Sequence, residues 1–165
     1  MYSEQQEISS MSTIDESVKN HFLSDEHHKK IKKNLLKICH RDILNRLCFV
    51  LRENHIVLDY RYFKFIANKE NYEAIILSVI TVMHECLHNN ETMVVHLNMK
   101  SLTLLDIEKH YYFIREISII MQQTFPDKLD KCFVYNAPFL FSQLYNTISM
   151  FIDKKTQKKI ELVSL

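Results

Sequence analysis

The pattern of hydrophobic and polar positions divides the chain into a polar start, a short helical region and a longer alternating region. Residues 1–23 are rich in Ser, Glu and Gln and have no regular apolar period, which predicts a loose tail. Residues 24–52 predict N-terminal helices, the second of them running from Arg41 to Arg52. Residues 53–165 are expected to form the main folded domain.

Short apolar runs alternate with longer helical patterns across this domain. The run 55–66 is rich in aromatic and β-branched residues and predicts one strand or a hairpin. Three further strands are predicted at Met93–Leu97, Cys132–Asn136 and Lys159–Val163. Helices are predicted between them at 71–88, from Thr103 to about Gln123, and from Pro138 onward. Helices of about 12 or more residues between apolar strands imply right-handed crossovers, so we predict an α/β fold with a mostly parallel sheet.

Two local signals bound the helix that precedes Cys132. Thr103 and Asp106 have the spacing of a capping signature at a helix N-terminus. Pro126 follows Phe125 and predicts the end of the helix, because the residue before a proline is disfavoured in the helical region.

The composition excludes several classes of function. The chain has 165 residues and no glycine, whereas average usage of ~7% would give about 12. Phosphate-binding loops, dinucleotide fingerprints and nucleophile elbows need backbone that glycine alone tolerates, so we expect none of them and no cofactor. The net charge of +1 gives no overall attraction to nucleic acid, which we do not expect as a partner.

Cysteine spacing and the start of the chain bear on the cellular compartment. The four cysteines include no C-x-x-C pair, and the first 13 residues lack an apolar signal core. The longest nearly apolar stretch, 74–83, is too short to span a bilayer. We therefore expect a cytoplasmic protein with reduced thiols.

Two clusters of basic residues leave a choice between a solvated surface and a membrane contact. One comprises His27–Lys30 with Lys32 and Lys33, and the other comprises Lys154, Lys155, Lys158 and Lys159. Each is either a solvated face or a surface attracted to anionic lipid, at ~1 kcal/mol per basic residue near the membrane.

The run His84-Glu85-Cys86-Leu87-His88 matches the HExxH pattern on a predicted helix. In zinc peptidases the two histidines of this pattern bind the metal and the glutamate activates water. The pattern here lies on the polar stripe of an otherwise apolar helix, which favours a solvated helix end. A zinc metallopeptidase at His84, Glu85 and His88 remains an alternative, which a third ligand would have to complete.

The stretch from Thr92 to Val163 resembles the CRAL-TRIO lipid-binding domain, the fold of the phosphatidylinositol-transfer proteins. Three runs carry the resemblance: Phe125-Pro126-Asp127-Lys128-Leu129, Cys132–Pro138, and Phe151-Ile152-Asp153 with Thr156 and Lys159-Ile160. They are similar to the family's aromatic-Pro-Glu-Arg-Leu turn, its strand leading into Asn-Ala-Pro, and its Phe-Leu-Asp-x-x-Thr-x-x-Lys-Ile ending. The resemblance implies an apolar lipid pocket floored by the sheet, and a protein that is not an enzyme.

The resemblance also implies a headgroup site. In phosphoinositide-binding members, an acid in the Pro-Glu-Arg turn and the Thr and Lys of the last motif serve the inositol phosphate end. The matching positions here are Asp127, Thr156 and Lys159. Lys159 would supply positive charge, Thr156 a hydrogen bond, and Asp127 would orient the lysine.

Departures from the family pattern leave the function open. The family's Asp after its first strand is His96 here, and the chain stops at Leu165, where the family continues with a gate helix. We therefore expect a divergent, C-terminally truncated member. Its expected function is binding of a phospholipid or other small hydrophobic ligand, with transient membrane association or transfer. The alternative is a protein-interaction module that binds a regulator such as a small GTPase, and a cavity above the sheet would discriminate between the two.

Overall fold

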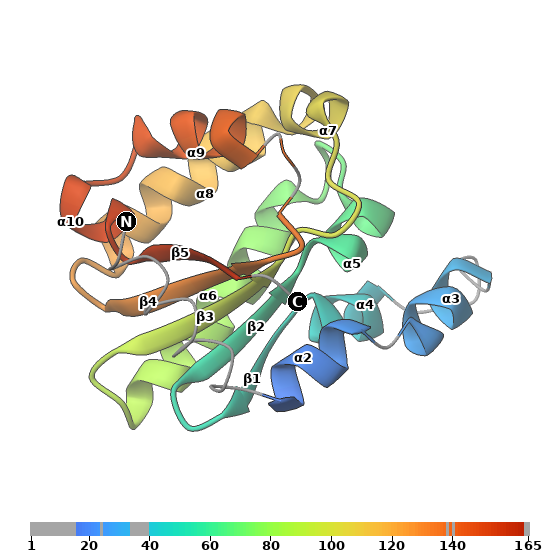
Figure 1. Cartoon of the computed structure of the whole chain (residues 1–165), viewed down its shortest axis with the longest axis horizontal. Coiled ribbons are helices and arrows are strands. Elements are labelled where there is room, and N and C mark those ends of the chain that lie inside the picture. Colours follow the sequence, from blue (N-terminus) through green and yellow to red (C-terminus); the bar gives the residue numbers. More distant parts are fainter. Residues whose placement is uncertain (1–15, 24, 34–39, 138, 140, 164–165) are drawn as a thin grey trace, which may run out of the picture.

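The computed structural model describes residues 16–23, 25–33, 40–137, 139 and 141–163, which form a sheet with helices packed on it (Figure 1). Over these residues the strands are β1 (Cys48–Arg52), β2 (His55–Asp59), β3 (Met93–Asn98), β4 (Leu129–Tyr135) and β5 (Ile160–Val163). The helices are α2 (Glu16–Leu23), α3 (Glu26–Lys33), α4 (His40–Leu47), α5 (Tyr60–Ile66), α6 (Tyr72–His88), α7 (Leu104–Lys109), α8 (Tyr111–Thr124), α9 (Phe141–Ser149) and α10 (Lys154–Gln157).

The sheet has the order β1-β2-β3-β4-β5 among the described residues. Strands β1 and β2 form an antiparallel hairpin, and β2, β3, β4 and β5 are mutually parallel. Val95 lies opposite Cys132, and Cys132 lies opposite Ile160, so the three apolar strands predicted from the sequence are neighbours. The predicted α/β class with a mostly parallel sheet is confirmed.

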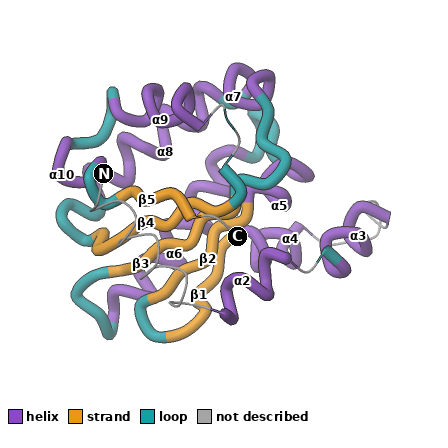
Figure 2. The backbone as a smooth tube through the Cα atoms, in the orientation of Figure 1, coloured by secondary structure: helices purple, strands orange, loops and turns teal. Residues whose placement is uncertain are grey.

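Side-chain alternation along the strands separates two faces of the sheet. One face carries Ile56, Val95 and Val134 and packs against the crossover helices α6, α8 and α9, which Figure 2 shows as purple tubes beside the orange strands. The opposite face carries Val57 and Phe133 among others and packs against α2. The cavity described below lies on the first face.

Helix α6 is the central crossover on the cavity face. Its buried side chains recur at three- and four-residue intervals and form one stripe: Ile75, Val79, Met83 and Cys86. This spacing places them on one side of an α-helix, where they pack against the sheet. The helix predicted at 71–88 is thus confirmed at 72–88.

Corrections concern the N-terminal third. Residues 16–23 are helical rather than loose, because Val18 and Phe22 lie one turn apart and are both fully buried against the sheet. The rest of the predicted tail, residues 1–15, lies outside the described residues, as do the predicted helix-opening residue Pro138 and Cys39.

The predicted helix from Arg41 to Arg52 is also corrected. It ends at Leu47, and Cys48–Arg52 forms strand β1, because its backbone pairs with β2 at the edge of the sheet. The sheet therefore begins before residue 53. The run 55–66 is one strand followed by helix α5. Asp59 caps the N-terminus of α5, because its side chain accepts a hydrogen bond from the Arg61 backbone amide.

The predicted helix from Thr103 is two helices, α7 and α8, separated at His110. The predicted capping signature is confirmed, since the side chains of Thr103 and Asp106 each accept a hydrogen bond from the other residue's backbone amide. Helix α8 ends at Thr124 with Phe125 as its C-cap, as Pro126 predicts. None of the described helices is long and apolar enough to cross a membrane.

Candidate functional site

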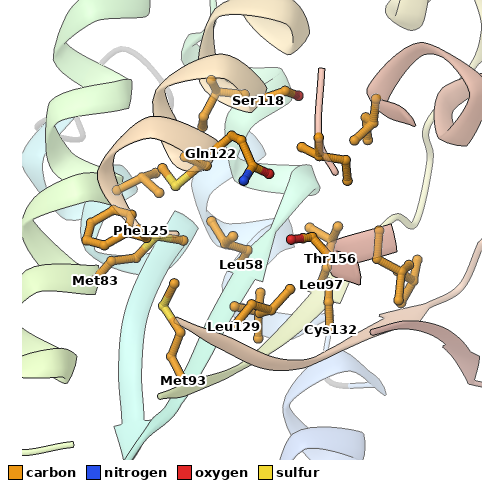
Figure 3. Close-up of a pocket in the computed structure, with 18 of the residues that line it drawn as sticks. Leu58, Met83, Met93, Leu97, Ser118, Gln122, Phe125, Leu129, Cys132 and Thr156 are labelled. Carbon is orange, nitrogen blue, oxygen red and sulfur yellow. The ribbon is translucent and has the colours of Figure 1, made fainter. Parts of the chain in front are cut away.

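An apolar cavity lies between the sheet and the helices that cover it, and it has two adjoining lobes. The first has a volume of about 230 Å³ and extends from β3 and β4 to α8, α9 and α10 (Figure 3). The second has a volume of about 210 Å³ and extends toward α5, α7 and the start of α8. Both lobes are lined by Leu58, Val79, Leu97, Ile117, Ser118, Leu144 and Ile148.

The walls of the cavity follow from the strand and helix periods. Alternate residues of β3 and β4 face it, among them Val95, Leu97, Cys132 and Val134. Ser118 and Gln122 are one turn apart on α8 and border it from the opposite side (Figure 3). The lining is almost wholly aliphatic and aromatic, so a ligand that fits it must be apolar over most of its surface.

The thiol of Cys132 belongs to this apolar lining. Burial raises its pKa to about 12, because the thiolate would lose its hydration. The thiol is therefore protonated at neutral pH and contributes packing surface to the cavity rather than a nucleophile.

Polar side chains gather at the α10 end of the first lobe. Thr156 and Asp127 line it, and in Figure 3 the Thr156 hydroxyl is directed toward the middle of the cavity. Asp153 caps α10 by accepting a hydrogen bond from the Thr156 amide at 2.6 Å, and its side chain also accepts one from Gln122 Nε2 at 3.0 Å. These bonds fix Thr156 and Gln122 relative to each other across the lobe.

The interactions of Asp127 and Lys159 differ from those that the family resemblance implies. Lys155 Nζ donates a hydrogen bond to Asp127 Oδ1 at 2.9 Å, and this bond raises the pKa of Lys155. Lys159 Nζ instead donates to the Leu129 carbonyl at 2.6 Å. Asp127 therefore orients Lys155, and the expectation that it orients Lys159 is corrected. Asp127 adopts a left-handed backbone with φ of 57° in the turn after Pro126.

The structure brings Asp127 and Thr156 together at the cavity, while the Lys159 ammonium is held beside them on the β4 backbone. Sequence reasoning missed Gln122 as a polar member of the site. Its position one turn after Ser118 on an otherwise apolar helix face was the available signal, because polar residues interrupt an apolar stripe rarely.

The HExxH residues are not among those that line this cavity. His84, Glu85 and His88 are exposed on the last turns of α6, and the His84 ring packs beside Phe125 with centroids 4.9 Å apart. No group of three or more His, Cys, Asp or Glu in the described parts of the chain is placed to hold a metal ion. The solvated helix end, rather than the zinc alternative, is what this geometry supports.

Similarity to known proteins agrees with this architecture. The family model described as the CRAL/TRIO domain matches residues 19–164. The Sec14 cytosolic factor of Schizosaccharomyces pombe is 36% identical over 73 residues, which are 44% of this chain and 26% of that protein. The SEC14 cytosolic factor of Yarrowia lipolytica is 33% identical over 75 residues, 46% of this chain and 15% of that protein.

The structural similarity extends further along the chain than the sequence similarity. The crystal structure of Sfh5 matches with a TM-score of 0.61 and 20% identity, over 77% of this chain and 50% of that one. This chain spans about a quarter or less of the length of the two curated relatives. Because the family model covers most of the residues and the solved structure shares the fold, the chain belongs to the CRAL/TRIO domain family.

Proposed function

We propose that the domain binds a lipid or another apolar small molecule in the cavity over the sheet. The observation that carries the proposal is the open apolar space of about 230 and about 210 Å³ in the two lobes. Together the lobes fall within the ~300–1,000 Å³ typical of small-molecule pockets. An apolar ligand would bury its surface against side chains that otherwise face unfilled space.

Burial of the apolar part would supply most of the affinity. Each methylene transferred from water contributes about 0.8 kcal/mol, whereas a single net hydrogen bond contributes about 0.5–1.5 kcal/mol. An acyl chain of several methylenes therefore outweighs any one headgroup contact. Polar groups at the cavity decide which end of the ligand lies where.

The polar end of a phospholipid fits best at the α10 end of the first lobe. Thr156 offers a hydroxyl there, beside the Gln122 amide that Asp153 holds in place, and Lys155 supplies positive charge beside Asp127. Lys159 would join this site by exchanging its bond to the Leu129 carbonyl for a phosphate oxygen. With Lys154 and Lys158, both exposed, this end also offers a basic surface to an anionic membrane.

The alternative of a protein-interaction module is less well supported by this geometry. A scaffold kept only for protein binding would be expected to have a collapsed pocket. The cavity here is open and lined on all sides by apolar side chains. Lipid binding is therefore the function that the site supports best.

A cavity-filling variant tests the proposal. Leu97 borders both lobes, so Leu97→Phe places extra carbon in the middle of the cavity. Leu105→Phe is the matched control, because Leu105 is 74% exposed on α7. Each protein is incubated with phosphatidylcholine vesicles that contain a minor fraction of phosphatidylinositol, re-isolated, and its bound lipid is quantified by mass spectrometry.

We expect wild type and Leu105→Phe to retain lipid and Leu97→Phe to retain at least tenfold less, with no loss of thermal stability. Wild-type protein that retains no lipid would overturn the proposed function. Equal retention by the two variants would place the ligand elsewhere. A Thr156→Val variant should lose phosphatidylinositol selectively, whereas Thr147→Val, outside the cavity lining, should not.

A further inference from the structure

Two side chains join helix α8 to the start of α10 at the polar end of the first lobe. Gln122 Nε2 donates a hydrogen bond to Asp153 Oδ2 at 3.0 Å, and the Asp153 backbone amide donates one to Gln122 Oε1 at 3.2 Å. The side-chain amide of Gln122 thus supplies both the donor and the acceptor that Asp153 needs. We call this pair of bonds the clamp. Gln122 itself lines the lobe.

Asp153 also holds Thr156 in place. Its Oδ1 atom accepts a hydrogen bond from the Thr156 backbone amide at 2.6 Å, while Oδ2 accepts the one from Gln122. Hydrogen bonds from the side chain and the backbone of Thr156 lower the pKa of Asp153, and the bond from Gln122 adds to this effect. The carboxylate is therefore charged at neutral pH and connects Thr156 to α8.

Helix α10 depends on tertiary contacts for its position. It has only four residues, and a helix of this length is not stable by itself. Gln157 Nε2 donates to the Ser149 and Ile152 carbonyls at 3.0 Å each, which joins α10 to α9. The bond from Lys155 to Asp127 reaches the turn before β4, but these side chains are 69% and 67% exposed, and exposed ion pairs contribute little stability. We therefore expect the clamp to fix α10 against α8.

We propose that Gln122 and Asp153 are positioning residues for the polar end of the ligand, because their clamp keeps the Thr156 hydroxyl at the wall of the first lobe. The inference rests on the proposed function and deepens it, since it assigns headgroup selectivity to a contact between two helices. Neither residue has to touch the ligand in this role. Without the clamp, α10 shifts relative to α8 and Thr156 is displaced, while the apolar lining of the cavity stays in place.

A double-mutant cycle tests the clamp. Gln122→Glu replaces the donor with a carboxylate that faces Asp153 and is repelled by it. Asp153→Asn keeps the helix cap, because asparagine caps as well as aspartate, but it turns an amide donor toward the Gln122 donor. In Gln122→Glu/Asp153→Asn the new carboxylate accepts from both the side-chain and the backbone amide at position 153, so both bonds form again.

The readout is the lipid that each protein retains from phosphatidylcholine vesicles with a minor fraction of phosphatidylinositol. Mass spectrometry of the re-isolated protein gives the total lipid and the ratio of phosphatidylinositol to phosphatidylcholine. Gln123→Glu is the matched control, because Gln123 is the next residue of α8, is exposed and lies outside the cavity lining. Thermal unfolding of each lipid-free protein shows whether the variant is folded.

We expect each single variant to lower the ratio about 3- to 10-fold, as for the loss of one hydrogen bond, and to change the total lipid less than about twofold. The double variant should recover most of the wild-type ratio, and Gln123→Glu should leave the ratio unchanged. Asp153→Asn separates positioning from charge. It removes a negative charge, which by itself would raise retention of the anionic lipid, whereas loss of the clamp lowers it.

The outcomes separate the clamp from the proposed function. Wild type that retains no lipid would overturn the proposed function and this inference with it. Retention by wild type with an unchanged ratio in both single variants would overturn the inference alone. So would a lowered ratio that the double variant does not restore, or a total lipid content that falls in proportion to the phosphatidylinositol. If Gln122→Glu does not fold, the direction of the change in Asp153→Asn decides by itself.

Discussion

At the residue scale, the surroundings of a polar side chain decide what it does, and residue type alone is a poor guide. Arg61 is 2% exposed and is held by Asp59 and Asp25, with Arg61 Nη2 2.8 Å from Asp59 Oδ2. It anchors the start of α3 to the sheet. Tyr60, its neighbour in sequence, lines the second lobe of the cavity, with the Asp106 carboxylate beside its hydroxyl. The sequence presents both only as members of the run 55–66, for which one strand or a hairpin is predicted.

Asp127 and Thr156, the positions that the family resemblance implies, line the first lobe, whereas Tyr60 and His110, which line the second, carry no such signal. The first two lie in short motifs with a recognisable order. Tyr60 and His110 are 50 positions apart, and the fold places both in the lining of the second lobe. No local sequence pattern encodes a proximity of this kind. Lys159 lies in a recognisable motif, but the sequence does not predict that its ammonium donates a hydrogen bond to the Leu129 carbonyl.

Protonation of His110 is expected to make stability depend on pH. Its folded-state pKa is lowered by burial and by Lys109, with Asp106 opposing, so the unfolded chain binds this proton more readily. Stability contributed by the neutral ring is therefore full above the unfolded value of about 6.5 and is lost as pH falls below it. The loss is at most about 1.4 kcal/mol per pH unit for one proton.

The measurement is the free energy of unfolding from urea titrations at several pH values. The difference between wild type and His110→Gln should decrease as pH falls from 7 toward 5. A wild-type advantage over His110→Gln that grows on acidification would show that the buried ring favours its charged form.

At the scale of elements, the apolar period predicted the parallel strands and the long helices, and tight turns were harder to predict. Without glycine, left-handed backbone is adopted by other residues: Glu53, Ser101, Asp127 and Asn136. The two-residue turn between β1 and β2 contains Glu53 and Asn54, with Arg52 opposite His55. Because the usual Asn-Gly or Asp-Gly signal is absent, the sequence predicts a helix over 41–52 and then one strand or a hairpin within 55–66, and not a hairpin that joins the two segments.

The same turn gives a stability prediction. A residue that has a Cβ destabilises the folded state by about 1–2 kcal/mol when its backbone is left-handed, and glycine removes this strain. Glycine also gives the unfolded chain more conformational freedom, which offsets about half of that gain. Glu53→Gly should therefore raise the free energy of unfolding by about 0.5–1 kcal/mol. Thermal unfolding should shift upward by roughly 2–4 °C per kcal/mol for a chain of this size.

Glu85→Gly is the matched control, since Glu85 is exposed inside helix α6. It should lower the free energy of unfolding by about 1 kcal/mol, because glycine is a poor helix former. If Glu53→Gly destabilised the protein as much as Glu85→Gly does, the turn would not be strained in the way that its φ of 43° implies.

At the scale of the whole molecule, the crossover helices leave space against one face of the sheet, and that space is the basis of the functional account. Helices α6, α8 and α9 meet the sheet with side chains that line two adjoining lobes (Figure 3). One end carries lysines beside Asp127. At the other end the carboxylates that line the cavity are paired, Asp59 with Arg61 and Asp106 with Lys64. A ligand with an apolar body and a polar end beside Asp127 would match this arrangement.

The most direct test of the account is to locate a bound acyl chain by NMR. Deuterated protein with protonated leucine methyl groups is loaded from phosphatidylcholine vesicles, and nuclear Overhauser effects to lipid methylene protons are recorded. The account predicts contacts to the three leucines that line both lobes, Leu58, Leu97 and Leu144. Contacts confined to the exposed Leu77, Leu105 and Leu162 would contradict it, because the lipid would then lie on the surface and not over the sheet.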